Sequence, residues 1–352
     1  MREHAVYLKK AKNEPYIVDT LECKVQGGYY PWVDVCKGLT LYLVIFGHLW
    51  YSTNLPIINT LIYSFHMPVY FILSGYVLNT NKRGKKKFIK QKFFTLLLPV
   101  YIYIFITLPF YLRHAWSGLQ TIRILLYVDG KVPYNDPCWF FITLFQVMIV
   151  ACMIKLPQKG VREKSIIGLL SFILGAIFYK LSIDYFGITK LCIAFGYLSM
   201  GTLIRDLSVK IRHSYINVPL YITGVLGIVW FFTAILNGKI SMYTVDLGNY
   251  VLFLMASVSG SLFFVQIIKT LTTKIRHVAY FIRVGNNTVF IVCTHYVLVP
   301  IIRRIGDKLL LTGTWKFGLI IALIVPIIVA CYLPICEWLS KHFPVVCGKL
   351  KI

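Results

Sequence analysis

An acid, a base and an imidazole lie on one face of the first apolar segment of the chain. Asp34, Lys37 and His48 fall within residues 32–51, whose other residues are mostly apolar. Because an α-helix turns once every 3.6 residues, Lys37 and His48 are expected about 20° apart around the axis and about 16 Å apart along it. Each ionisable group costs about 2.5–3.5 kcal/mol in lipid, so such groups normally face a cavity and mark function.

Two further histidines, His66 and His295, also fall within apolar segments. Neutral imidazole is tolerable in a low-dielectric environment and can still accept a proton, so all three are candidate proton acceptors. Pro68 follows His66 and cannot donate to the carbonyl of Ser64, which predicts a kink beside His66. Simpler interpretations stay open, because His66 and His295 would also suit interhelical hydrogen bonds and His48 an interfacial position.

The charged pair at the start of this segment also has two interpretations. Asp34 and Lys37 are spaced i, i+3 and could form a mutual ion pair near the membrane interface. Alternatively, they could serve a ligand that lies along the helix face they share with His48. The order of these groups along one apolar segment favours the second interpretation.

The composition indicates a helical membrane protein. Of the 352 residues, 58% are hydrophobic and only 14% are charged, against about a quarter in a soluble protein. The apolar runs are about 20 residues long, enough to span a hydrocarbon core of about 30 Å, whereas a β-barrel would show short alternating strands. We expect an all-α bundle of about ten spans within a domain at 32–335, after a polar segment at 1–31 and before a tail at 336–352. The expected spans are 32–51, 56–78, 93–112, 138–156, 165–181, 187–204, 216–236, 248–268, 287–302 and 316–335.

The basic residues give these spans an orientation. With both termini in the cytoplasm, the cytoplasmic segments hold 25 Lys and Arg residues and the outer segments hold 7, as the positive-inside rule requires. The run at 81–87 is the most basic. It is interpreted as a topology anchor on anionic lipid that can also attract an anionic cosubstrate. This distribution explains the net charge of +24 without nucleic acid as a partner.

The cysteines do not indicate a metal site or a disulfide framework. All nine are scattered, and most lie inside apolar runs, where they are expected to act as small packing residues. No cluster of carboxylates and histidines appears, so no metal is expected.

Four segments resemble the acyltransferase 3 family of integral membrane acyltransferases. Residues 32–48 resemble its first helix, with a basic residue and a histidine eleven apart, although many members have Arg where this chain has Lys37. Residues 63–76, around His66, resemble the second helix of the fucose 4-O-acetylase-like branch. Residues 138–145, with Trp139, and 284–295, ending in His295, resemble two later and weaker motifs. Thr288 stands where the family usually has serine.

The resemblance implies that the protein moves an acyl group, usually acetyl, from cytosolic acyl-coenzyme A to a hydroxyl of a cell-surface or lipid-linked glycan. His48 is then expected to be the catalytic base, with His66 as its partner or a second base. Lys37 would contact coenzyme A, and Asp34 would hold Lys37. His295 and Trp139 are additional candidates. The resemblance also implies a multi-pass protein of the bacterial cytoplasmic membrane, with its oligomeric state open.

Two other function classes remain open from the sequence. A secondary transporter would use Asp34, Lys37 and His66 as a polar relay, and a non-catalytic scaffold for glycan assembly would need none of them. An acetyl-histidine relay is an open variant of the transferase. The outer segment 113–137 carries aromatic and acidic residues that suit either an aromatic belt at the interface or sugar binding. These residues are Trp116, Tyr127, Asp129, Tyr134 and Asp136.

Overall fold

The computed structural model describes residues 30–50, 56–80, 84–113, 118–132, 135–210, 219–272 and 278–350. These residues form helices joined by short turns, without a named β-strand in the described ranges. The helices, including one π-helical turn (η1) and four 3₁₀ turns (η2–η5), have the following bounds: α2 Pro31–Trp50, α3 Pro56–Tyr76, α4 Lys85–Lys92, η1 Phe93–Leu97, α5 Leu98–Arg113, α6 Gly118–Leu125, η2 Asp136–Cys138, α7 Trp139–Met153, η3 Leu156–Gln158, α8 Val161–Lys180, η4 Tyr185–Gly187, α9 Ile188–Lys210, α10 Leu220–Asn237, α11 Tyr250–Thr272, α12 Val278–Gly285, α13 Thr288–Thr294, η5 His295–Val297, α14 Leu298–Lys308 and α15 Trp315–His342.

The protein is a polytopic all-α membrane protein, as the sequence predicts. Nine helical segments in the described part of the chain are long and apolar enough to cross a membrane. The segment expected to be a further span, 165–181, forms helix α8, but it is not among these nine. Its first turn carries Arg162, Glu163 and Lys164, and charges in an apolar window lower its suitability for lipid. The helix itself is therefore confirmed, while the count of spans by length and composition is nine.

Helices α2 and α3 form the centre of the bundle. Most of their residues are buried, and α3 packs against α2, α9 and α11. Gly75 of α3 and Gly201 of α9 let these two backbones approach closely, because a Cβ atom on either would lie 2.0 Å from a carbonyl oxygen of the other helix. Small residues at such crossings are the usual means of close packing in membranes.

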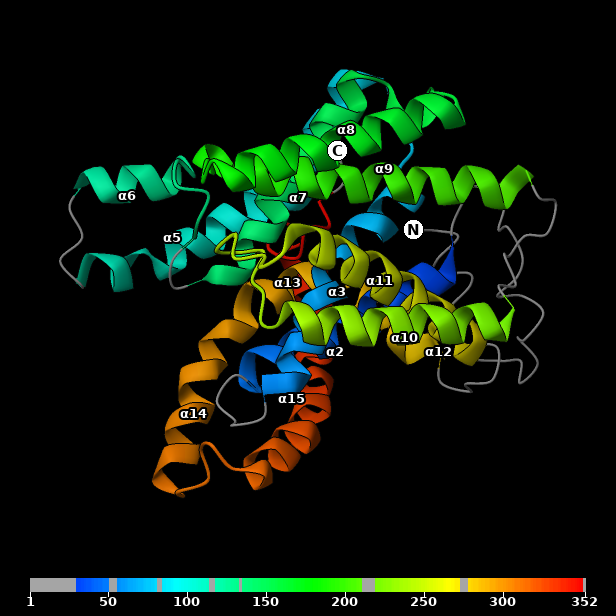
Figure 1. Ribbon diagram of the computed structural model, residues 1–352. Coiled ribbons are helices and arrows are strands. Elements are labelled where there is room, and N and C mark those ends of the chain that lie inside the picture. The colour runs from blue at the N-terminus through cyan, green and yellow to red at the C-terminus, as the bar shows by residue number, and fades with distance from the viewer. Residues whose placement is uncertain are drawn as a thin grey trace.

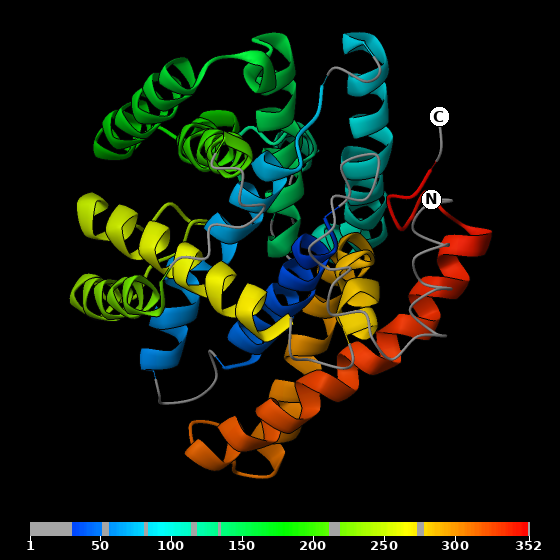
Figure 2. The same ribbon diagram turned by 90° about the vertical axis from the view of Figure 1, so that its right-hand side faces the viewer.

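The remaining helices surround this centre as packed pairs. Helices α8 and α9 run side by side, as do α10 and α11 (Figure 1). The turn that joins α14 and α15 projects from the bundle (Figures 1 and 2), while α15 also packs against α2. The short helix α12 packs on α2, where Gly38 and Gly285 lie at the contact.

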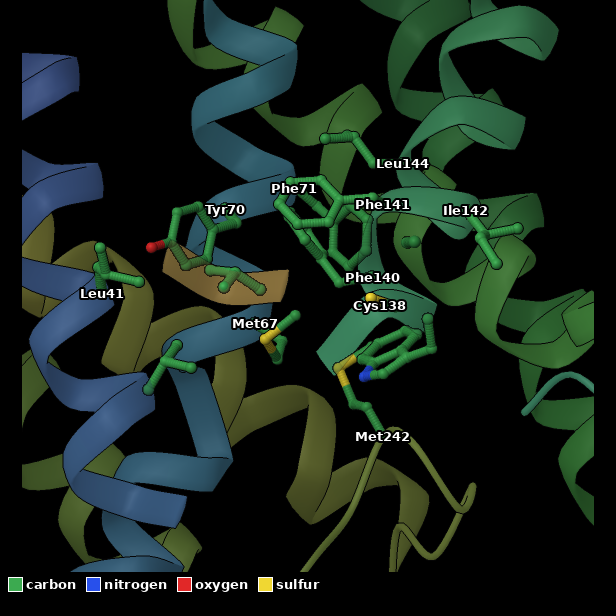
Figure 3. Packing of buried hydrophobic residues seen from close by; sticks show 14 of the residues in the cluster. Leu41, Met67, Tyr70, Phe71, Cys138, Phe140, Phe141, Ile142, Leu144 and Met242 are labelled. Atoms are coloured by element: carbon green, nitrogen blue, oxygen red, sulfur yellow. The ribbon is translucent and has the colours of Figure 1, made fainter. Parts of the chain in front are cut away.

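The largest buried apolar cluster joins α2, α3 and α7 with the segment between α10 and α11. Figure 3 shows Tyr70, Phe71 and Phe140 packed together, with Met242 from that segment near Cys138. The ring centroids of Phe71 and Phe140 lie 5.1 Å apart, which is within the range of favourable aromatic contacts. This packing holds the start of α7 against the middle of α3.

The last helix is longer than the sequence predicts. Helix α15 continues to His342, seven residues beyond the expected end of its span, and Cys336 is the last buried residue of its inner face. The expected tail therefore begins as helix. Beyond it the chain returns to the bundle, where the Tyr103 hydroxyl donates to the Val346 carbonyl at 2.9 Å and Lys349 Nζ donates to Asn287 Oδ1 at 2.6 Å. The segment 1–29, which is most of the expected N-terminal segment, lies outside the described residues.

Candidate active site

A cavity of about 460 Å³ lies between α2, α3, the start of α7, α14 and the segment between α10 and α11. His48, His66 and Trp139 line it, so three of the six candidate residues from the sequence share one cavity. The complete lining is Val44, His48, Tyr63, His66, Met67, Tyr70, Asp136, Pro137, Trp139, Phe140, Lys239, Ile240, Ser241, Met242, Tyr243, Thr244, Asp246, Val292, Tyr296, Val299 and Arg303.

His48 lies near the end of α2 and is held by Tyr63 of α3. The Tyr63 hydroxyl lies 3.3 Å from His48 Nδ1, and their rings meet edge to face with centroids 6.1 Å apart. Gly47 makes this approach possible, since a Cβ atom there would lie 3.0 Å from Tyr63 Cε2. A side chain at position 47 would push Tyr63 away, so the Phe46-Gly47-His48 sequence positions the imidazole as well as supplying it.

His66 is buried in the middle of α3, one turn after Ile62. Its Nδ1 lies 2.8 Å from the Ile62 carbonyl oxygen. Because a carbonyl oxygen only accepts hydrogen bonds, Nδ1 must carry the proton. In the neutral ring the lone pair is therefore on Nε2, and His66 also contacts Tyr63, with ring centroids 5.0 Å apart. Tyr63 thus lies against both cavity histidines. Pro68 lies within α3, which continues through it to Tyr76.

His295 lies beside His48 and does not line the cavity. The centroids of the two imidazoles are 5.3 Å apart. His295 Nδ1 donates to the Ile291 carbonyl at 3.0 Å, and its buried Nε2 makes no hydrogen bond within the described residues. The expected span 287–302 is broken here into α13, η5 and α14. Pro300 contributes to the break, since it has no N–H to donate to the Tyr296 carbonyl.

The start of α7 brings Asp136 and Trp139 to the cavity. Pro137 lies in the η2 turn that leads into α7, a position where its missing N–H costs no helix hydrogen bond. Asn135 Nδ2 donates to the Cys293 carbonyl at 3.0 Å, which fixes this turn to α13. The Tyr296 hydroxyl donates to Asp136 Oδ2 at 2.9 Å. Segments about 160 residues apart in the sequence therefore meet beside His48.

Lys37 and Asp34 lie outside the cavity lining. Lys37 Nζ and Asp34 Oδ1 are 3.3 Å apart, so the mutual ion pair that the sequence left open is present. The Lys37 side chain is 24% exposed. The Tyr70 hydroxyl, which points toward α2 (Figure 3), donates to the Lys37 carbonyl at 2.9 Å. Tyr70 also lines the cavity, so it connects the Lys37 turn of α2 with that space.

The residues expected in the outer segment 113–137 separate in the structure. Asp136 lines the cavity, whereas Asp129 pairs with Arg123 on the surface and the Arg123 guanidinium lowers the pKa of that carboxyl. Tyr127 is buried away from the cavity lining. Trp116 and Tyr134 lie outside the described residues.

Sequence reasoning missed the tyrosines and the segment between α10 and α11. The sequence did contain a signal for the tyrosines. On one helix face, His66 has Tyr63 three residues before it and Tyr70 four residues after it, and His295 is followed directly by Tyr296. The alternating orientation of the spans places 237–247 in a short outer connection, whereas the structure brings residues 239–244 and 246 to the cavity. The glycines at 238 and 248, both with positive φ, mark a tight structure there. The described residues contain no group of three or more His, Cys, Asp or Glu side chains arranged to hold a metal ion.

The comparisons with known proteins support one family. The acyltransferase 3 family model, described as an acyltransferase domain, matches residues 30–333. No curated protein and no solved structure is significantly similar to the chain. The matched range contains every cavity-lining residue. Because the match covers most of the 352 residues, the chain belongs to the acyltransferase 3 family and is a membrane acyltransferase.

Proposed function

We propose that the protein transfers an acetyl group from acetyl-coenzyme A to a hydroxyl of a cell-surface or lipid-linked glycan, in the cavity lined by His48 and His66. The observation that carries the proposal is the convergence of these two imidazoles and Tyr63 on one cavity of about 460 Å³. Acyl transfer to a hydroxyl needs a base at the acceptor oxygen, and imidazole is the side chain best suited to that task near neutral pH.

The imidazole takes up one proton and gives it back during the reaction. The base takes the acceptor's hydroxyl proton as that oxygen attacks the thioester carbonyl carbon. The carbon–sulfur bond then breaks, a carbon–oxygen ester bond remains, and the imidazolium returns the proton to the coenzyme A thiolate. We assign the base to His48, which Tyr63 orients. His66 is the second candidate, because its Nδ1–H is held by Ile62 and its Nε2 carries the lone pair.

Trp139 is assigned to the carbonyl oxygen of the donor. Its indole N–H is a donor only, and Trp139 lines the same cavity as His48 and His66. A hydrogen-bond donor placed where negative charge develops on the thioester oxygen lowers the barrier most in a water-poor site. This role fits the late Trp-Phe motif that the sequence singles out around position 139.

Lys37 is assigned to the phosphates or the pantetheine of coenzyme A. It lies about 16 Å along α2 from His48, at the end predicted to be cytoplasmic. Asp34 holds its ammonium group, and Tyr70 lies between this turn and the cavity. A donor bound here would have to pass or displace Tyr70 to bring its thioester to His48. Coenzyme A is long and flexible, so it suits this separation.

The test is release of coenzyme A thiol by the purified protein in nanodiscs, with acetyl-coenzyme A as donor and the glycan fraction of the source cells as acceptor. The wild-type protein should release coenzyme A and add O-acetyl groups visible by NMR. His48→Ala should abolish both. His342→Ala is the matched control, because His342 donates to the carbonyl four residues earlier as His66 does but is exposed at the end of α15. Normal transfer by a folded His48→Ala protein would refute the assignment.

A further inference from the structure

The connection between α10 and α11 forms one wall of the cavity. We call residues 238–249 the α10–α11 hairpin, because Ser241 and Asp246 pair in antiparallel fashion, with N···O distances of 2.7 and 2.9 Å. Seven residues of the α10–α11 hairpin line the cavity, a larger share than any single helix contributes. These are Lys239, Ile240, Ser241, Met242, Tyr243, Thr244 and Asp246.

The α10–α11 hairpin is fixed at both ends and at its tip. At its base, Asn237 Nδ2 donates to the Leu247 carbonyl at 2.9 Å, and the Asn249 N–H donates to Asn237 Oδ1 at 2.8 Å. At its tip, Lys190 Nζ donates to the Tyr243 carbonyl at 3.2 Å. Lys190 is itself buried and ion-paired with Asp184. The wall is therefore preformed, which lowers the ordering cost of binding a ligand against it.

Asp136 connects this wall with the histidines. Its carboxylate accepts from the Tyr296 hydroxyl and has the Tyr243 side chain as a second hydrogen-bond partner. A carboxylate has about four lone-pair positions, so two tyrosine donors leave it able to accept from a ligand hydroxyl. The Tyr296 ring lies edge to face with His48, with centroids 5.3 Å apart. Asp136 is thus separated from the assigned base by one tyrosine side chain.

The exposed part of the cavity lining is polar. Lys239, Thr244, Asp246 and Arg303 line the cavity and are exposed, and with Asp136 the lining carries two cations and two carboxylates. Buried lining residues are apolar or aromatic, including Met242 and Trp139. A surface of aromatic rings with a carboxylate and hydroxyls suits an uncharged ring that carries several hydroxyl groups, whose faces are apolar and whose edges donate hydrogen bonds.

We propose that the α10–α11 hairpin and Asp136 form the acceptor subsite, in which Asp136 and Tyr243 hold one hydroxyl of a sugar ring while another hydroxyl lies at His48. This proposal rests on the acyl-transfer function given above. Asp136 and Tyr243 are positioning residues, because they select and orient the acceptor and take no proton from the reacting oxygen. Their removal should therefore weaken acceptor capture more than thioester cleavage.

The test measures how acetyl is partitioned between sugar and water. Purified protein in nanodiscs receives acetyl-coenzyme A labelled in the acetyl group, together with methyl hexopyranosides and methyl deoxyhexopyranosides, or 1-butanol as a simple alcohol. Acetylated sugar and free acetate are separated and counted. In the wild type, at least one glycoside should be acetylated and 1-butanol should react far less. In Tyr243→Phe and Asp136→Asn, the KM for the glycoside should rise about tenfold and the ratio of sugar ester to acetate should fall by a similar factor.

Two matched controls and one catalytic variant complete the design. Tyr185→Phe and Asp307→Asn make the same chemical changes at exposed positions outside the cavity lining, and both should retain the wild-type ratio. His48→Ala should lose ester and acetate together. The subsite is overturned if the folded Tyr243→Phe and Asp136→Asn proteins keep the wild-type ratio, or if 1-butanol is acetylated as well as every glycoside. A wild-type protein that releases no coenzyme A would overturn the acyl-transfer function itself, and with it the subsite.

Discussion

The imidazoles of His48 and His295 lie with their centroids 5.3 Å apart, yet only His48 lines the cavity. His48 lies on α2 and His295 lies in the η5 turn, so the two rings come from residues that are far apart in the sequence. His295 is held by Ile291, and its ring lies beside that of His48 at an interplanar angle of 44°. Of the two histidines, only His48 can therefore contact a ligand in the cavity. The sequence alone does not distinguish them in this way.

Substitution of each histidine should separate these roles. His48→Ala should lower the rate of acyl transfer about 10²- to 10⁴-fold, the usual contribution of a general base. His295→Ala should lower it much less, because it removes packing behind the base and no group from the cavity. Coenzyme A release at saturating donor and acceptor measures both, with His342→Ala as control. Equal losses in the two variants would assign His295 a direct part in the chemistry.

Removal of the Tyr63 hydroxyl should slow the reaction without unfolding the protein. A neutral hydrogen bond contributes about 0.5–1.5 kcal/mol, so loss of the contact with His48 Nδ1 should lower kcat roughly tenfold in Tyr63→Phe. The KM for acetyl-coenzyme A should change little. Steady-state kinetics beside Tyr185→Phe, an exposed residue, provide the comparison. An unaltered kcat would mean that Tyr63 does not orient the base.

Lys37 should affect the donor and leave the acceptor alone. If its ammonium binds coenzyme A, Lys37→Met should raise the KM for acetyl-coenzyme A about tenfold, within the range for hydrogen bonds to charged groups. Lys37→Arg should remain near the wild type, since a positive charge is kept. Lys341→Met, at an exposed position of α15, is the control. A KM effect confined to the acceptor would contradict the assignment.

Close packing of α3 and α9 predicts a large effect from a single methyl group. A Cβ atom on Gly201 would lie 2.0 Å from the Ile72 carbonyl oxygen, whereas one on Gly224 would meet nothing within 4 Å. Overpacking typically costs about 1–3 kcal/mol, so Gly201→Ala should lower the apparent Tm in detergent by several degrees. Gly224→Ala, also within a helix, should not lower it. Equal melting temperatures would contradict the close contact.

The start of α8 predicts a pH-dependent contribution to stability. Glu163 Oε2 accepts from the Gly160 N–H at 2.8 Å, and this contact, followed by Lys159, lowers the pKa of the Glu163 carboxyl. Since a lowered pKa means that the folded state binds fewer protons, the contribution is present above the unfolded pKa and is lost as the pH falls through the folded pKa. The Tm difference between wild type and Glu163→Gln should therefore be positive at pH 7 and shrink toward pH 3. A difference that does not change with pH would exclude this carboxylate as its source.

The helices could be predicted from the sequence because lipid imposes a simple rule on composition. The expected segment 32–51 and helix α2 (Pro31–Trp50) agree within one residue, since each apolar run must satisfy its own backbone hydrogen bonds. The same rule placed His48 and His66 inside the bundle. The rule gives the apolar span and not the end of its helix, since α15 continues to His342 through Glu337, Ser340 and Lys341.

The rest of the site depends on contacts that hydropathy does not encode. Tyr296 reaches Asp136 across about 160 residues of sequence, and nothing in either segment specifies that partner. The α10–α11 hairpin has the composition of an ordinary polar connection, and its place over the cavity follows from the packing of α10 and α11 beside α3. For Lys37 the sequence offers two interpretations, an ion pair with Asp34 and a contact with a ligand. The structure shows the ion pair.

The histidine side of the cavity and the α10–α11 hairpin come from separate parts of the chain, so each can change in evolution without the other. The two cavity histidines lie on α2 and α3, while the α10–α11 hairpin is a single uninterrupted stretch of twelve residues, 238–249, held at its base by Asn237 and Asn249. A lineage could therefore exchange this one stretch by insertion, deletion or recombination and inherit the reaction chemistry intact. If this stretch forms the acceptor subsite as proposed, such a division would let acceptor preference change while the transfer machinery stays the same.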